Sequence, residues 1–244
     1  MKIVKEHIYE SFKQGDDKLS SLGLGKKYLI EKWLAEFNIK DYYINRDFSI
    51  DAYGEVILAY RELTELPSYI QFNKIDRKTS SQQVGFSVAH TKLSSLRGCP
   101  KEVMGTFDCS NNNLKSLKFG PEYVWGTYFC EHNQIETLEG CPKYIGRNFH
   151  AEHNKLTTLE YGPVSVGGSY FCYDNSLITL KGSPLIIPGD FNCKNNINLD
   201  SLEGAPKEIH GELVIELTKL SELSDKEIRN QIKITRKYTH ENHK

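Results

Sequence analysis

Two Glu-His pairs stand 21 residues apart in the middle of the chain, and their side chains are suited to chemistry. They are Glu131-His132 and Glu152-His153, with His150 close to the second pair. On neighbouring parallel strands, about 4.8 Å apart, these groups could share a divalent ion. His150 and a glutamate could also act as general acid and base, but an open sheet rarely excludes water. We therefore expect no metal site and no enzyme activity, and keep metal or small-ligand binding on this patch as a lesser alternative.

The six cysteines do not form a metal-binding or redox motif. No Cys-x-x-Cys pair occurs, which argues against a tetrahedral zinc site. We expect small reduced thiols that fill a tight core, in a cytoplasmic protein without a cofactor. They occupy two kinds of position, four within predicted strands and two directly before a proline: Cys109, Cys130, Cys172 and Cys193, then Cys99 and Cys141.

A 21-residue repeat determines the elements that must position all these residues. An aromatic residue usually lies two positions before each reference residue, an Asn three after it, Leu or Ile five and eight after it, and a Pro about twelve after it. The aromatic and reference residues alternate with period two, which predicts a short strand with both side chains inward. The Asn is predicted to satisfy backbone groups where the chain leaves the strand. The reference residues are Val88, Cys109, Cys130, Ala151, Cys172, Cys193 and, after 22 residues, Ile215.

A divergent first unit precedes the regular repeats. Leu58 lies 30 residues before Val88, so this unit carries about nine extra residues. The insertion contains a polar run from Asn73 to Gln83, which predicts a protruding loop. We count eight strands in all.

The pattern, as in Phe107 to Pro121, resembles the leucine-rich repeat of bacterial proteins such as internalins and ubiquitin-ligase effectors. It is most similar to uncharacterised repeat proteins of phages and bacteria, over about residues 40–225. The resemblance implies an α+β leucine-rich-repeat solenoid, with a parallel sheet on a concave face and irregular convex returns. No ligase domain follows the repeats, so that activity is not implied. For a phage-encoded chain the resemblance implies binding and modulation of a host protein, such as a defence component.

Both ends of the solenoid are predicted to carry helical caps, since solenoids need covered ends. Apolar residues have helical spacing from Tyr28 to Phe37, and a first helix is possible over Val4–Phe12. Ser224 and Glu227 form a capping-box pattern for a C-terminal helix. The predicted parts are a helical N-terminal cap (1–53), the solenoid (54–223), and a C-terminal capping helix with a frayed basic tail (224–244).

The composition excludes several classes of partner. Lys and Arg number 31 against 32 Asp and Glu, a net charge of -1. Residues 86–214 carry 11 basic and 14 acidic side chains, so we expect no nucleic-acid binding. No apolar run approaches the ~18 residues of a membrane span. The first ten residues lack the apolar region of a signal peptide, which favours a cytoplasmic location.

The side chains that flank the reference residues are expected on the concave face. In the central units they combine aromatic rings with charges, which is typical of a protein-binding hot spot. We therefore predict a non-enzymatic protein-binding module, with a structural or self-assembling subunit as the alternative. The predicted partner-binding residues are Asp108, Phe129, Glu131, His132, His150, Glu152, His153, Phe171, Tyr173, Asp174 and Lys194.

Overall fold

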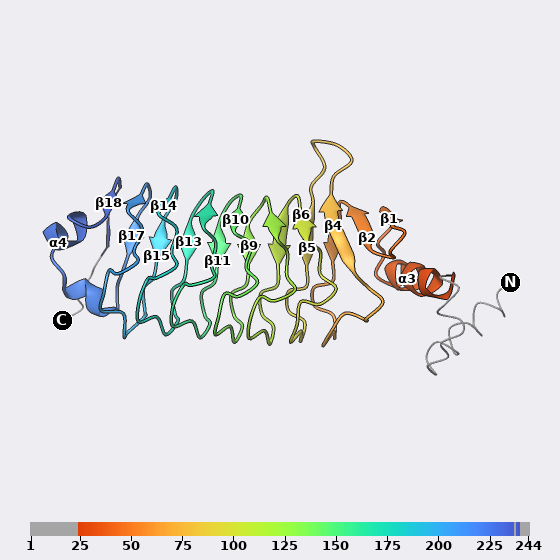
Figure 1. The fold of residues 1–244 in the computed structure, drawn as a ribbon, viewed down its shortest axis with the longest axis horizontal. Coiled ribbons are helices and arrows are strands. Elements are labelled where there is room, and N and C mark those ends of the chain that lie inside the picture. The colour runs from red at the N-terminus through yellow and green to blue at the C-terminus, as the bar shows by residue number, and fades with distance from the viewer. Residues whose placement is uncertain (1–23, 237, 240–244) are drawn as a thin grey trace.

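The computed structural model describes residues 24–236, 238 and 239, which form an elongated β-solenoid of about nine coils (Figure 1). The 21-residue repeat is one coil, a form compatible with a leucine-rich-repeat-like unit. The principal sheet has nine parallel strands, one from each coil. These are β3 (Glu55–Ile57), β5 (Gly85–Ser87), β7 (Thr106–Asp108), β9 (Tyr128–Phe129), β11 (Phe149–His150), β13 (Tyr170–Phe171), β15 (Phe191–Asn192), β17 (Leu213–Val214) and β19 (Tyr238–Thr239).

An aromatic spine runs through the core beneath this sheet. The six coils from Phe86 to Phe191 each contribute the aromatic residue two positions before the reference residue, and successive ring centroids lie 5.0–5.9 Å apart. The reference residues and both leucine positions are also buried. Period two therefore predicted the strand positions correctly, and a chain with 39% hydrophobic residues needs only this thin core.

We had expected irregular returns, and this expectation is wrong. The returns form a second series of parallel strands. The cause is a buried column of β-branched residues six positions before each reference residue, such as Val103, Val124 and Ile145. A seven-stranded sheet contains β1 (Tyr42–Ile44), β2 (Ile50–Tyr53), β4 (Phe72–Asp76), β6 (Glu102–Val103), β8 (Tyr123–Val124), β10 (Tyr144–Ile145) and β12 (Ser165–Val166). A three-stranded sheet follows, with β14 (Ile186–Ile187), β16 (Glu208–Ile209) and β18 (Lys233–Ile234).

The N-terminal segment combines a helix with a hairpin. Helix α3 (Leu24–Glu36) lies at the end of the stack (Figure 1), and its Trp33 ring is 6.3 Å from Phe72, which continues the spine to Phe86. The segment that we predicted as a helical cap over 1–53 also contains strands, because β1 pairs antiparallel with β2. The first predicted helix, Val4–Phe12, lies outside the described residues.

The insertion does form a projecting loop, between β4 and β5 (Figure 1). Asn73 to Asp76, which we assigned to the loop, instead belong to β4. An ion pair of 2.8 Å between Lys78 and Asp41 joins the loop to the segment before β1.

The C-terminal segment continues the solenoid beyond the predicted helix. After a 3₁₀ turn (Lys219–Glu222), helix α4 (Asp225–Arg229) begins with the capping box of Ser224 and Glu227. The tail does not fray directly after it, because β18 pairs with β16 and β19 with β17. A ninth coil therefore forms where we expected a basic tail.

The asparagine ladder has the predicted role. Asn154 donates to the carbonyl oxygens of Cys130, Ala151 and Glu152 at 3.1–3.2 Å, and its Oδ1 accepts from the Ile135 amide at 2.9 Å. Asn112, Asn133, Asn175 and Asn196 repeat these bonds. All six cysteines are free and buried, as predicted.

Candidate partner-binding face

The predicted site residues gather on the outer face of the nine-stranded sheet, in three columns that cross the coils. The first column lies on the strands themselves. The His150 ring is stacked between Phe129 and Phe171, with both centroid distances 4.6 Å. Asp108 lies beside Phe129 on the neighbouring strand β7. Its carboxylate accepts hydrogen bonds from the amide and hydroxyl of Ser110. The strands thus hold three rings in a preformed stack.

The second column carries Glu131, Glu152, Tyr173 and Lys194, each of which directly follows a buried reference residue. Glu152 is only 6% exposed, and its Oε1 contacts His150 Nδ1 at 3.0 Å and accepts from the Tyr173 hydroxyl at 3.5 Å. The Lys194 ammonium lies 5.5 Å from the centre of the Tyr173 ring. Glu152 therefore positions its neighbours and is too buried to contact a partner directly.

Glu131 has an unusual acidity. Its pKa is raised from 4.5 to about 7, first by burial and then by the nearby charges of Glu152 and Asp108, while a backbone hydrogen bond and His150 oppose the rise. One oxygen of Glu131 and one of Glu152 are buried without a hydrogen-bond partner among the described residues. Near neutral pH, Glu131 is accordingly poised to gain or lose a proton.

The third column contains His132, His153 and Asp174, and its residue types have a backbone explanation. His132 and His153 stack at 4.2 Å, and His153 Nδ1 lies 3.6 Å from an Asp174 oxygen. All three have left-handed backbone, with φ of 51–53°, as do the equivalent His90 and Asn111. Asn, Asp and His tolerate this conformation best. The left-handed turn after each strand thus explains why histidine occurs at positions 132 and 153.

The geometry does not favour the metal alternative. Within the described part of the chain, no three His, Cys, Asp or Glu side chains are arranged to hold a metal ion. The histidine pair stacks face to face instead of converging on one point.

The sequence analysis missed a second exposed surface, on the face of the return strands. Large apolar side chains that are 51–69% exposed lie there. A cavity of about 470 Å³ opens beside Tyr161, Val164 and Leu185. The signal was the recurrence of aromatic or aliphatic residues just after the return prolines. We define this apolar strip as Tyr123, Trp125, Tyr144, Tyr161, Val164, Leu185 and Ile186.

The chain matches no protein-family model, no curated protein and no solved structure. None of the helices in the described ranges combines the length and apolar character needed to cross a membrane.

Proposed function

We propose that this chain is a leucine-rich-repeat-like, non-enzymatic module that binds a protein partner through the outer face of its nine-stranded sheet. The single observation that supports this function is the preformed stack of Phe129, His150 and Phe171 beside charged and hydroxyl-bearing side chains. Rings already held in place lose little freedom on binding, so the stack favours affinity. The site is an open sheet face, which suits a protein surface better than a small substrate.

The setting of the proposed partner follows from the same features. Six free thiols inside the core suit a reducing, cytoplasmic compartment. The similarity of the repeat to phage and bacterial proteins makes a host protein, such as a defence component, the partner to search for first if the chain is phage-encoded. Helix α3 and helix α4 would then serve as caps for the ends of the binding scaffold.

Quantitative affinity capture from a bacterial lysate tests the binding face. We compare wild type with a Phe129→Ala/Phe171→Ala double variant and with Ile178→Ala, which removes a 55% exposed apolar residue outside the columns. Wild type and Ile178→Ala should retrieve the same proteins, and the double variant should lose them while keeping its circular dichroism spectrum. Equal retrieval by all three proteins would refute the proposed face.

The alternative function, a self-assembling subunit, is favoured by the apolar strip. Exposed apolar side chains on consecutive coils form the kind of patch that marks association sites. Sedimentation velocity over a concentration series should then show an oligomer that a Tyr144→Ser/Leu185→Ser variant converts to monomer. A wild-type protein that stays monomeric excludes this alternative.

A further inference from the structure

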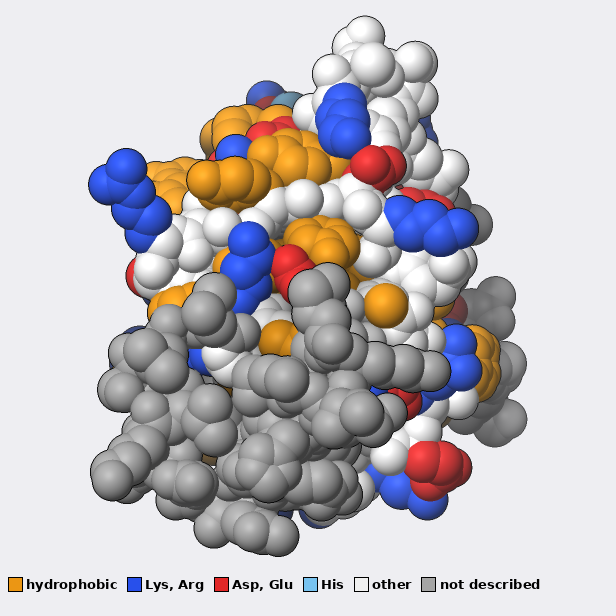
Figure 2. All heavy atoms as spheres, turned by 90° about the vertical axis from the view of Figure 1, so that its right-hand side faces the viewer, with side chains coloured by type: hydrophobic (Ala, Val, Ile, Leu, Met, Phe, Trp, Pro, Cys, Tyr) orange, Lys and Arg blue, Asp and Glu red, His pale blue; other side chains and the backbone are white. Residues whose placement is uncertain are grey.

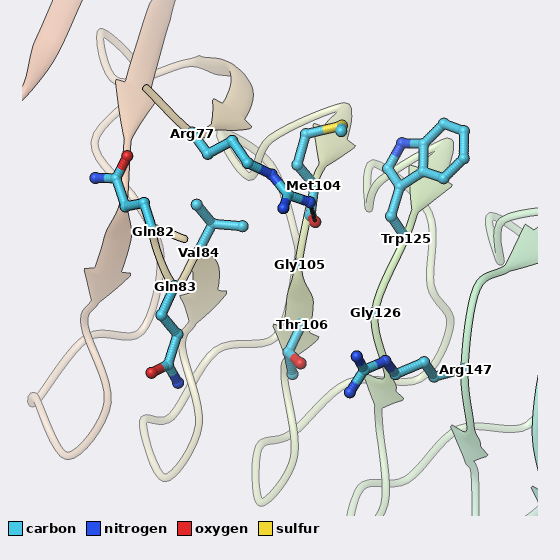
Figure 3. A pocket seen from close by; sticks show the side chains of 10 residues that line it. All are labelled: Arg77, Gln82, Gln83, Val84, Met104, Gly105, Thr106, Trp125, Gly126 and Arg147. Carbon is cyan, nitrogen blue, oxygen red and sulfur yellow. Dashed lines mark hydrogen bonds between the residues drawn. The ribbon is translucent and has the colours of Figure 1, made fainter. Parts of the chain in front are cut away.

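A cavity of about 520 Å³ lies at the base of the projecting loop, away from the stacked rings of the nine-stranded sheet, and it shares Trp125 with the apolar strip. The loop supplies Arg77, Gln82 and Gln83 on one side (Figure 3). The segments that join the two sheets supply the other side, with the Trp125 indole at one end and the Arg147 guanidinium at the other (Figure 3). Figure 2 shows the loop rising above this end of the molecule, with hydrophobic side chains near its base.

Arg147 departs from the repeat at this cavity. The position four residues before the reference residue is Gly in six coils, whereas Val84, Arg147 and, in the ninth coil, Arg236 differ. Val84 and Arg147 line the cavity. The close approach of the backbone falls instead on Gly146, where a Cβ would lie 2.1 Å from the Trp125 carbonyl oxygen. An arginine side chain therefore fits at a position that glycine occupies in six other coils.

The cavity carries positive charge without compensation. No Asp or Glu is among the described residues that line it. Arg147 is exposed, and its side chain makes no ion pair or hydrogen bond within the described ranges. Arg77 donates only to the carbonyl oxygens of Ser80 and Met104, both at 3.4 Å. Both guanidinium groups can therefore still bind an anion.

The geometry points to a binding site for a small organic anion, whose phosphate or carboxylate head group binds Arg77 and Arg147 and whose flat apolar body packs on Trp125. Guanidinium groups match the paired oxygens of both head groups. Trp125 is 58% exposed and offers an aromatic face, and Val84 and Met104 add apolar contact. The volume falls within the range of about 300–1,000 Å³ usual for small-molecule sites.

Phenyl phosphate is a suitable probe because it combines both recognition elements. We would titrate it by calorimetry and by tryptophan fluorescence, since Trp33 is buried and Trp125 is the exposed reporter. Benzoate tests the carboxylate head group, and inorganic phosphate tests the head group without the ring. The variants are Arg147→Gly, which restores the Gly-Gly of the next coil (Gly167-Gly168), and Arg77→Gln. Arg97→Gln is the matched control, because Arg97 stacks on Phe119 outside the cavity.

Saturable binding of phenyl phosphate or benzoate is expected, tighter than that of inorganic phosphate. Both cavity variants should weaken it by about tenfold or more, and Arg97→Gln should not. The inference is overturned if neither aromatic anion binds saturably up to about 10 mM, or if Arg147→Gly binds as well as wild type. The experiment needs no protein partner, so its outcome is independent of the proposed function.

Discussion

At the scale of single residues, we expect the loss of one ladder asparagine to lower the free energy of unfolding more than other side-chain truncations of similar size. Asn154→Ala leaves the Ile135 amide and the carbonyl groups around it without their side-chain partner. Because buried backbone groups without partners are costly, we expect a loss of about 2–4 kcal/mol in the free energy of unfolding. Urea denaturation measures it, with the exposed neighbour Lys155→Ala as control. A loss below about 1 kcal/mol would show that water replaces the amide.

Glu131 makes stability depend on pH. Its pKa is about 7 in the folded protein, raised first by burial, against an ordinary value of 4.5. Between these values the folded state keeps a proton that the unfolded state releases, so stability falls as pH rises from 4.5 to 7. Allowing for screening of a partly exposed side chain, the loss is about 1–2 kcal/mol.

Glu131→Gln should remove this loss, because the amide does not ionise. The variant is expected to gain stability over wild type at pH 8 and to match it near pH 5. Urea unfolding at the two values provides the measurement, with the exposed Glu136→Gln as control. The same difference from wild type at both pH values would contradict the assignment.

At the scale of the elements, the side chain in each return matches the size of the aromatic residue that follows it, so that a small return residue goes with a larger ring. Tyr128 and Tyr170 follow returns whose glycine leaves room for a hydroxyl, and a Cβ at Gly120 or Gly162 would lie only 3.3–3.4 Å from it. Phe107 and Phe149 follow returns that carry a buried cysteine instead. The cysteine and the tyrosine hydroxyl thus fill similar space in alternate coils.

Tyr170→Phe tests this complementarity. The Tyr170 hydroxyl is buried without a hydrogen-bond partner among the described residues, so its removal should leave stability unchanged or raise it by up to about 1 kcal/mol. Thermal and urea unfolding check the expectation beside Tyr161→Phe, whose side chain is 63% exposed. Clear destabilisation by Tyr170→Phe would instead show that the hydroxyl has a partner, such as a buried water.

The elements also show which parts of the fold a sequence can predict. The inward pairs such as Phe107 and Cys109 alternate with period two, and this predicted the strands of the principal sheet. From β6 onward the return strands have only two residues each, too short for a periodic signal, although the β-branched column from Val103 onward marks them. The left-handed backbone at His132 and the burial of Glu152 depend on packing between coils and could not be predicted from the sequence.

At the scale of the whole molecule, the solenoid presents two long faces with different chemistry. The face of the nine-stranded sheet carries stacked rings with charged groups, and the opposite return strands carry the apolar strip. Both faces are built on the same rigid ladder of backbone hydrogen bonds, which leaves little to reorganise on binding. We propose that the protein partner binds the first face.

Site-specific photo-crosslinking to the captured partner distinguishes the two faces directly. A benzophenone amino acid replaces either His132, an exposed residue of the first face, or Tyr144, which is 62% exposed on the apolar strip. The account predicts a crosslink to the partner from position 132 and none from position 144. A crosslink from position 144 alone would contradict it and move the binding site to the apolar strip.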